Sequence, residues 1–222
     1  MKTEEQVGFV RKVLGIVAAQ MALTFAFALL ASINSSAGSF FKDPRVLILS
    51  LIAFIVCTCY LFFNKDMRRT VPYNYMLLGA ITVCEATIIA SVAANITAMS
   101  VLVCIMAVCL STAGLWLAAV YTSTREHLQR NLMTGLAFAM IANIVVLLIM
   151  VFTMQFQDKT LVFVLGVIML AVSGIFILFD LLMIIVPGAV DKEDYILAAL
   201  NLYLDIARLF YYILILFGEK KQ

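Results

Sequence analysis

This sequence has few charged residues. Only 13% of its 222 residues are charged and 65% are hydrophobic, whereas a soluble domain carries about 25% charge. A soluble fold of this length exposes too much surface to hide so many apolar side chains. The low charge therefore excludes a soluble globular domain and makes the lipid bilayer the solvent for most of the chain. The net charge of +2 and the lack of a basic tract also exclude a nucleic-acid partner.

Histidine is almost absent, which excludes several kinds of catalytic site. His127 is the only histidine, so the sequence offers no Ser/His/Asp set and no zinc-type spacing of cysteine with histidine. The five cysteines all fall inside apolar runs, where cysteine behaves as a small hydrophobic residue. There is no phosphate-binding loop either. These absences predict a protein that is not an enzyme and has no cofactor.

Long apolar runs make up most of what is present. A helix that spans a bilayer needs about 20 mostly apolar residues, and seven stretches meet or nearly meet this length. The three prolines fall at or beside the ends of stretches, where helices start or stop. The stretches are approximately 13–33, 46–63, 73–94, 99–121, 131–154, 161–186 and 195–217. The sequence therefore predicts an all-α polytopic membrane protein, with residues 1–222 forming a single transmembrane helical domain.

Lysine and arginine are divided unequally between the two sets of connections. The N-terminal tail and the second, fourth and sixth connections hold nine of them, against three in the first, third and fifth. Because basic residues favour the cytosolic side, the N-terminus is predicted to be cytosolic. Lys220 and Lys221 in the C-terminal tail favour the same side for that tail. Whether the last stretch spans the membrane or re-enters it therefore stays open.

Charged side chains inside the predicted spans are costly, so each invites a functional interpretation. Asp205 and Arg208 are three residues apart and share one helical face, which is compatible with a purely structural ion pair. Asp180 lies near the end of the preceding span, and a short connection makes the two spans antiparallel neighbours. If Asp180 and Asp205 approach each other, they cannot both ionise cheaply and would share a proton. Such a pair can bind a cation, including calcium, and can gate.

Glu85 lies about halfway along the third stretch. Two interpretations are equally open for it. Either the carboxyl group is protonated and bonded to a neighbouring helix, or it lines a water path. Gln20, by contrast, is interpreted as structural, because polar amides often hydrogen-bond one membrane helix to another.

Four motifs together indicate a family. Residues 195–206, YILAALNLYLDI, resemble the hallmark last helix of the transmembrane Bax inhibitor motif (Lifeguard) family, and residues 177–180, ILFD, resemble its other aspartate motif. Residues 9–17, FVRKVLGIV, resemble the entry to its first helix. Residues 72–86, PYNYMLLGAITVCEA, resemble the third helix of the Golgi anti-apoptotic branch, where a glutamate also follows the threonine. The match covers nearly the whole chain in the same order.

This resemblance implies six to seven transmembrane helices, the last central, in Golgi or endoplasmic reticulum membranes. It implies a pH-sensitive calcium leak or cation channel, with lowered store calcium and protection from apoptosis. The family's di-aspartyl sensor corresponds to Asp180 and Asp205, and an acidic position tied to conduction in the Golgi branch corresponds to Glu193. The implied partners are the bilayer, calcium or other cations, and other membrane channels or cell-death regulators.

Two positions depart from the family pattern. Arg208 stands where the family usually has a neutral residue, and Leu181 stands where it often has a polar one. An arginine beside the aspartates should keep Asp205 ionised and repel a cation. Two hypotheses follow: a cation leak gated by Asp180 and Asp205, or a non-conducting scaffold that regulates calcium channels or cell-death proteins. An intramembrane aspartyl protease is disfavoured, because neither aspartate has the Tyr-Asp or Gly-x-Gly-Asp context of that class.

The charge bias generates a prediction about topology. An N-terminal tag with a protease site should be cleaved by protease added outside sealed microsomes, because the nine-to-three bias places that end in the cytosol. The measurement is loss of the tag on a blot before detergent is added. Protection of the tag until the membrane is opened would show that the orientation is reversed.

Overall fold

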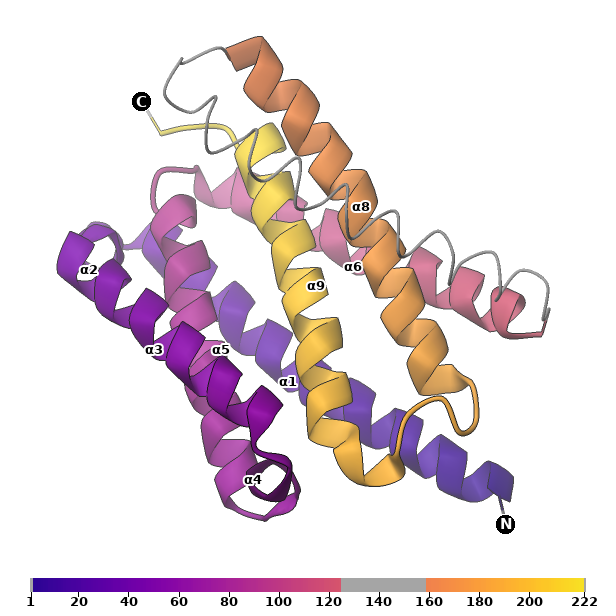
Figure 1. Cartoon of the computed structure of the whole chain (residues 1–222). Coiled ribbons are helices and arrows are strands. Elements are labelled where there is room, and N and C mark those ends of the chain that lie inside the picture. Colours follow the sequence, from indigo (N-terminus) through magenta and orange to yellow (C-terminus); the bar gives the residue numbers. More distant parts are fainter. Residues whose placement is uncertain (1, 125–158, 222) are drawn as a thin grey trace.

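The structure, a computed structural model, describes residues 2–124 and 159–221, and within these ranges the chain is helical apart from short connections (Figure 1). Six helices are long and apolar enough to cross a membrane. Two short helices and one 3-10 turn lie in the connections. The elements are α1 (Lys2–Ile33), α2 (Ser35–Lys42), α3 (Pro44–Phe63), α4 (Lys65–Arg69), α5 (Tyr73–Ala93), α6 (Ala98–Ser123), α8 (Lys159–Ile185), η1 (Lys192–Asp194) and α9 (Tyr195–Phe217).

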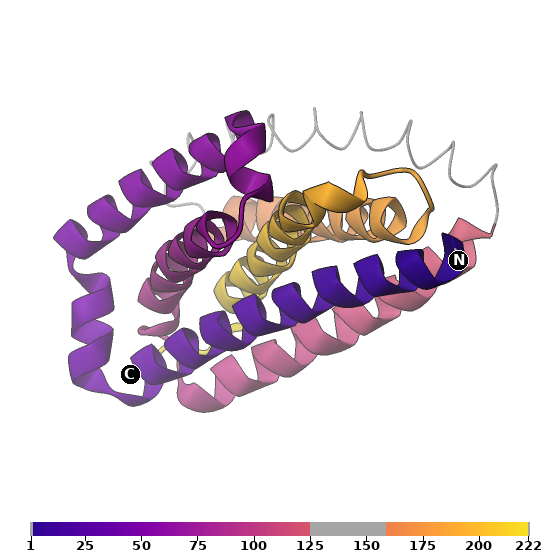
Figure 2. The same ribbon diagram turned by 90° about the horizontal axis from the view of Figure 1, so that it is seen from below.

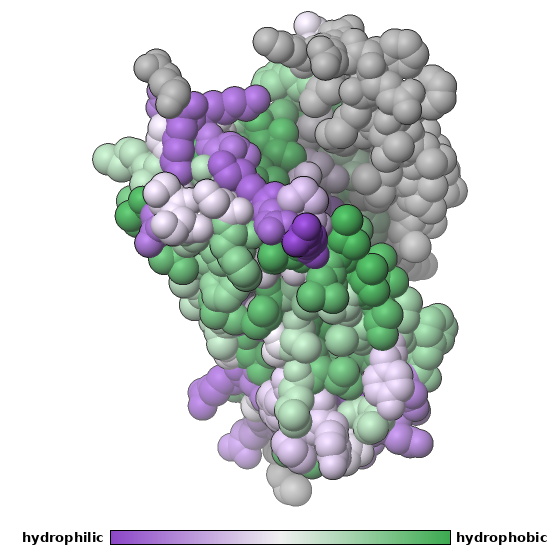
Figure 3. Space-filling model, turned by 90° about the vertical axis from the view of Figure 1, so that its left-hand side faces the viewer, coloured by the Kyte–Doolittle hydropathy of each residue, from purple (hydrophilic) through white to green (hydrophobic). Residues whose placement is uncertain are grey.

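The prediction of an all-α polytopic membrane protein is confirmed. Large apolar side chains are exposed along α3, α6 and α8, where a soluble protein would present polar ones. Figure 3 shows an apolar band between two more polar ends on the face that it presents. The predicted stretch 131–154 lies outside the described residues.

Most predicted boundaries agree with the helices, and the differences have local causes. The stretch 195–217 coincides with α9, whereas α1 begins at Lys2, well before the predicted residue 13. Glu4 and Glu5 lie in the first turn of α1, where the helix dipole favours acidic side chains. The short helices were missed because they depend on caps and not on hydropathy. The Asn34 side chain, for example, accepts hydrogen bonds from the backbone N–H groups of Ser36 and Ala37 at the start of α2.

The last helix is central, as the resemblance implied. α9 packs against α1, α5, α6 and α8 (Figures 1 and 2). Of the 23 residues of α9, 14 are buried, whereas Leu61 is the only buried residue among the 20 of α3. α9 is unbroken over 23 residues. This length and continuity agree with the alternative in which the last stretch spans the membrane.

The C-terminal tail lies at the opposite end of the bundle from the N-terminus (Figure 1). It pairs with the connection between α5 and α6. The Thr97 N–H donates to the Glu219 carbonyl at 2.9 Å, and the Lys221 N–H donates to the Asn95 carbonyl at 2.9 Å. The expectation that the tail lysines return it to the N-terminal side is thus not met.

A chain of buried hydrogen bonds joins three of the helices. The Gln20 amide of α1 donates to the Thr82 hydroxyl of α5 at 2.8 Å. One turn further along α1, the Thr24 hydroxyl is 2.9 Å from the Tyr203 hydroxyl of α9. All four side chains are buried. Since lipid offers polar groups no partner, these bonds fix α1 against α5 and α9, in agreement with the structural interpretation of Gln20.

Candidate functional site

The structure brings Asp180 and Asp205 together. Asp180 lies five residues before the end of α8, Asp205 lies in the middle of α9, and the two helices pack side by side. The two carboxyl groups lie within electrostatic range of each other. Asp205 is 9% exposed, and Oδ2 of Asp180 is buried without a hydrogen-bond partner among the described residues. A hydrogen bond between these two carboxyl groups would require one of them to carry a proton.

Arg208 lies beside this pair. Its Nη1 atom is 3.3 Å from Oδ1 of Asp205, one helical turn away on the same face of α9. The ion pair between Asp205 and Arg208, which their three-residue spacing allows, is therefore present. Arg208 also lies within electrostatic range of Asp180, so its charge acts on both carboxyl groups. Its side chain is 40% exposed, whereas that of Asp205 is 13% exposed.

Glu85 belongs to the same electrostatic group. It is half-buried on α5 and lies within electrostatic range of Arg208 and of the Tyr203 and Tyr211 hydroxyls of α9. Within residues 2–124 and 159–221, no hydrogen bond joins Glu85 to another side chain. The described helices thus offer no hydrogen-bond partner for the first interpretation, in which the Glu85 carboxyl group is bonded to a neighbouring helix. We call Glu85, Asp180, Asp205 and Arg208 the intramembrane cluster.

Calcium at Asp180 and Asp205 stays a prediction. The described part of the chain has no group of three or more His, Cys, Asp or Glu side chains that could hold a metal ion. Two carboxyl groups alone provide fewer oxygen ligands than the six to eight that calcium usually takes. Any calcium bound here would need water or backbone carbonyls for the rest of its shell.

Glu193 lies away from the intramembrane cluster. It belongs to an ion-pair latch, which we define as Arg68, Arg69, Asp191, Glu193 and Asp194. Arg69 pairs with Glu193 and contacts Asp191 at 2.7 Å and Asp194 at 2.9 Å. Arg68 contacts Asp194 at 3.0 Å and 3.2 Å through two of its nitrogens. The latch therefore ties the end of α4, just before α5, to the turn that leads into α9.

Two groups of the latch, Asp191 and Arg69, have pKa values that are shifted away from neutral pH. The Glu193 backbone N–H and the Arg69 guanidinium hold the pKa of Asp191 below its ordinary value. The hydrogen bond to Asp194 raises the pKa of Arg69 further above that of a free arginine. A lowered carboxyl pKa gives a contribution that is present above the ordinary pKa and is lost only as the pH falls through the lowered value. Asp191 and Arg69 thus do not titrate between about pH 5 and 8.

Sequence reasoning identified Glu193 but missed the latch. The signal was available as two runs of opposite charge, Arg68-Arg69 and Asp191-Lys192-Glu193-Asp194. Both runs lie in connections that the charge bias places on the same side of the membrane. What the sequence does not give is that α5 and α9 bring these two connections into contact.

The fold and the site define a class of protein: a polytopic helical membrane protein with a carboxyl pair between its last two helices. A family model described as "Inhibitor of apoptosis-promoting Bax1" matches residues 6–222. The chain is also 32% identical over 210 residues to Golgi anti-apoptotic proteins of Vaccinia virus strains Lister, LC16m0 and LC16m8. These alignments cover 94% of this chain and 84% of each relative. The chain belongs to the Bax inhibitor family.

The latch generates a prediction about stability. Asp194→Asn should lower the free energy of unfolding by about 2 kcal/mol, because it leaves two arginines without their shared buried carboxylate. Asp66→Asn, an exposed change on α4, is the matched control and should have little effect. The measurement is the melting temperature of the detergent-purified protein. Equal melting temperatures for the two variants would mean that the latch contributes nothing measurable.

Proposed function

We propose that this chain is an anti-apoptotic membrane protein of the Golgi or endoplasmic reticulum and that it conducts calcium or another cation under the control of Asp180 and Asp205. Membership of the Bax inhibitor family and the names of the Vaccinia virus relatives support the anti-apoptotic part. The observation that carries the conducting part is the meeting of two carboxyl groups between α8 and α9.

The charge of the intramembrane cluster supports cation or proton binding. With every group ionised, the three carboxylates and one guanidinium sum to a net charge of −2. Such a charge inside a bilayer needs compensation. Two protons would neutralise it, and so would one divalent cation. Protons and a divalent cation are therefore alternative occupants of the same region in this proposal.

The ion pair between Arg208 and Asp205 favours a second candidate. A fixed positive charge 3.3 Å from Asp205 repels a permeant cation at the position where the proposed path is gated. A non-conducting scaffold that acts on calcium channels or cell-death proteins needs no such path. The intramembrane cluster would then only hold α5, α8 and α9 together.

Flux through the purified protein in liposomes separates the two candidates. The leak proposal expects calcium or potassium flux well above that of protein-free liposomes and dependent on pH between about 5 and 8. Asp180→Asn and Asp205→Asn should each abolish most of the pH dependence, because either change removes the shared proton. Asp191→Asn in the latch is the matched control and should leave the pH profile unchanged. Absence of flux from folded wild-type protein would favour the scaffold.

Arg208 provides a second prediction for the same assay. Arg208→Asn removes the charge that favours the ionised pair, so the carboxyl groups should take up their proton at higher pH. The pH midpoint of flux should therefore move upward by about one pH unit. Arg208→Lys, which keeps the charge, is the control and should stay closer to the wild type. A midpoint that is unaffected by Arg208→Asn would rule out control of the pair by this arginine.

A further inference from the structure

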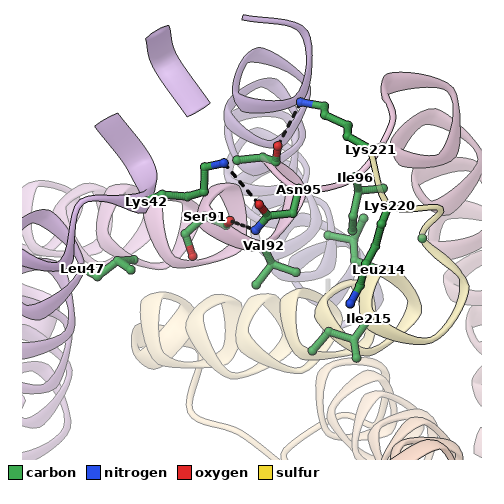
Figure 4. Close-up of a pocket in the computed structure, with 12 residues that line it drawn as sticks. Lys42, Leu47, Ser91, Val92, Asn95, Ile96, Leu214, Ile215, Lys220 and Lys221 are labelled. Atoms are coloured by element: carbon green, nitrogen blue, oxygen red, sulfur yellow. Dashed lines mark hydrogen bonds between the residues drawn. The ribbon is translucent and has the colours of Figure 1, made fainter. Parts of the chain in front are cut away.

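A cavity of about 840 Å³ opens at the end of the bundle where the C-terminal tail lies. It is bordered by the end of α2, the start of α3, the ends of α5 and α9, and the tail (Figure 4). Three of its lining residues are lysines: Lys42, Lys220 and Lys221. No acidic residue lines it among the described residues. The cavity therefore carries a local charge of about +3 in a chain whose net charge is +2.

The lysines are not neutralised within the described part of the chain. None of the ion pairs in residues 2–124 and 159–221 includes any of the three. The Lys42 ammonium donates to Oδ1 of Asn95 at 3.2 Å, and the Lys221 ammonium donates to the Ala94 carbonyl at 2.9 Å. An ammonium has three N–H donors. Each of these two bonds uses one donor, so donors remain for a ligand.

Helix ends explain only part of this arrangement. Lys42 lies in the last turn of α2, and Lys221 bonds to the carbonyl that follows α5; helix C-termini favour a nearby cation. That effect accounts for Lys42 at the end of α2 and for Lys221 at the end of α5. It does not account for three lysines around a single cavity with no acidic side chain on its lining. The excess of positive charge points to an anionic occupant.

The rest of the lining indicates which kind of anion fits. Leu47, Val92, Leu214 and Ile215 contribute apolar side chains from the membrane-spanning helices α3, α5 and α9. The lysines come from the end of α2 and from the tail, beside this apolar wall. Lysine ammonium groups donate charge-assisted hydrogen bonds to phosphate oxygens. A soluble anion would gain nothing from contact with the apolar wall. A phospholipid can place its phosphate on the lysines and its acyl chains along that wall.

We propose that this cavity binds the headgroup of an anionic phospholipid through Lys42, Lys220 and Lys221. The bound lipid would bridge α3 to the tail and to the connection between α5 and α6. It would thereby strengthen the tail pairing formed by Thr97 with Glu219 and by Asn95 with Lys221. The proposal is independent of ion conduction, because the intramembrane cluster contributes no residue to this cavity.

The test uses the full-length protein reconstituted in phosphatidylcholine vesicles that contain phosphatidic acid. The protein is then extracted in mild detergent, and the phosphatidic acid that stays bound is counted by native mass spectrometry. The wild type should retain phosphatidic acid in preference to phosphatidylcholine. Lys42→Gln, Lys220→Gln and Lys221→Gln should each weaken retention about fivefold, the effect of one basic residue near an anionic headgroup.

Matched variants separate charge from folding. Lys65→Gln, in α4 at the other end of the bundle, removes an exposed lysine and should leave retention unchanged. Combined Lys→Arg changes at the three positions keep the charge and should keep the binding. Retention in the three Gln variants equal to that in Lys65→Gln would overturn the proposal. Displacement of phosphatidic acid by equimolar inorganic phosphate would also overturn it, because the pocket would then belong to a soluble anion.

Discussion

The bilayer supplies no hydrogen bonds, and the position of α9 follows from this constraint. α9 carries an aspartate, an arginine and a buried tyrosine within two helical turns, and none of these can face lipid without a partner. Its neighbours provide the partners: α1 offers Thr24 to Tyr203, and α8 offers Asp180 to Asp205. A helix with polar groups on several faces must be surrounded by other helices. The central position of α9 is thus a consequence of its own side chains.

α5 and α9 are fastened to each other at both ends. Arg68 and Arg69, just before α5, hold Asp194, just before α9. Residues 95–97, just after α5, pair with residues 219–221, just after α9. The two helices therefore run in the same direction with their ends tied, and sliding of one along the other would break both connections. Between the ties lie Glu85 and Arg208, which are linked only electrostatically.

The sequence predicts those features that depend on neighbours along the chain. The spans follow from hydropathy, the Asp205–Arg208 pair follows from a spacing of three residues, and the approach of Asp180 follows from the short connection between α8 and α9. The latch and the tail pairing were missed because each joins connections more than 120 residues apart. Nothing in the local pattern says which connections meet. The Arg208 charge near Glu85 was missed for the same reason, since only the packing of α5 on α9 brings them together.

The two charged regions of the described chain differ in their balance of charge. In the latch, two arginines face three carboxylates, and every carboxylate has a guanidinium partner. The lowered pKa values of Asp191 and Asp194 and the raised pKa of Arg69 keep these three groups ionised near neutral pH. In the intramembrane cluster, one arginine faces three carboxylates, and lipid replaces water. Under the proposed function, a proton or a metal cation would offset this shortage of positive charge, and occupancy by one would oppose occupancy by the other. The proposal therefore places a pH response in the cluster and not in Asp191 and Arg69 of the latch, because the shifted pKa values of those two groups keep them ionised between about pH 5 and 8.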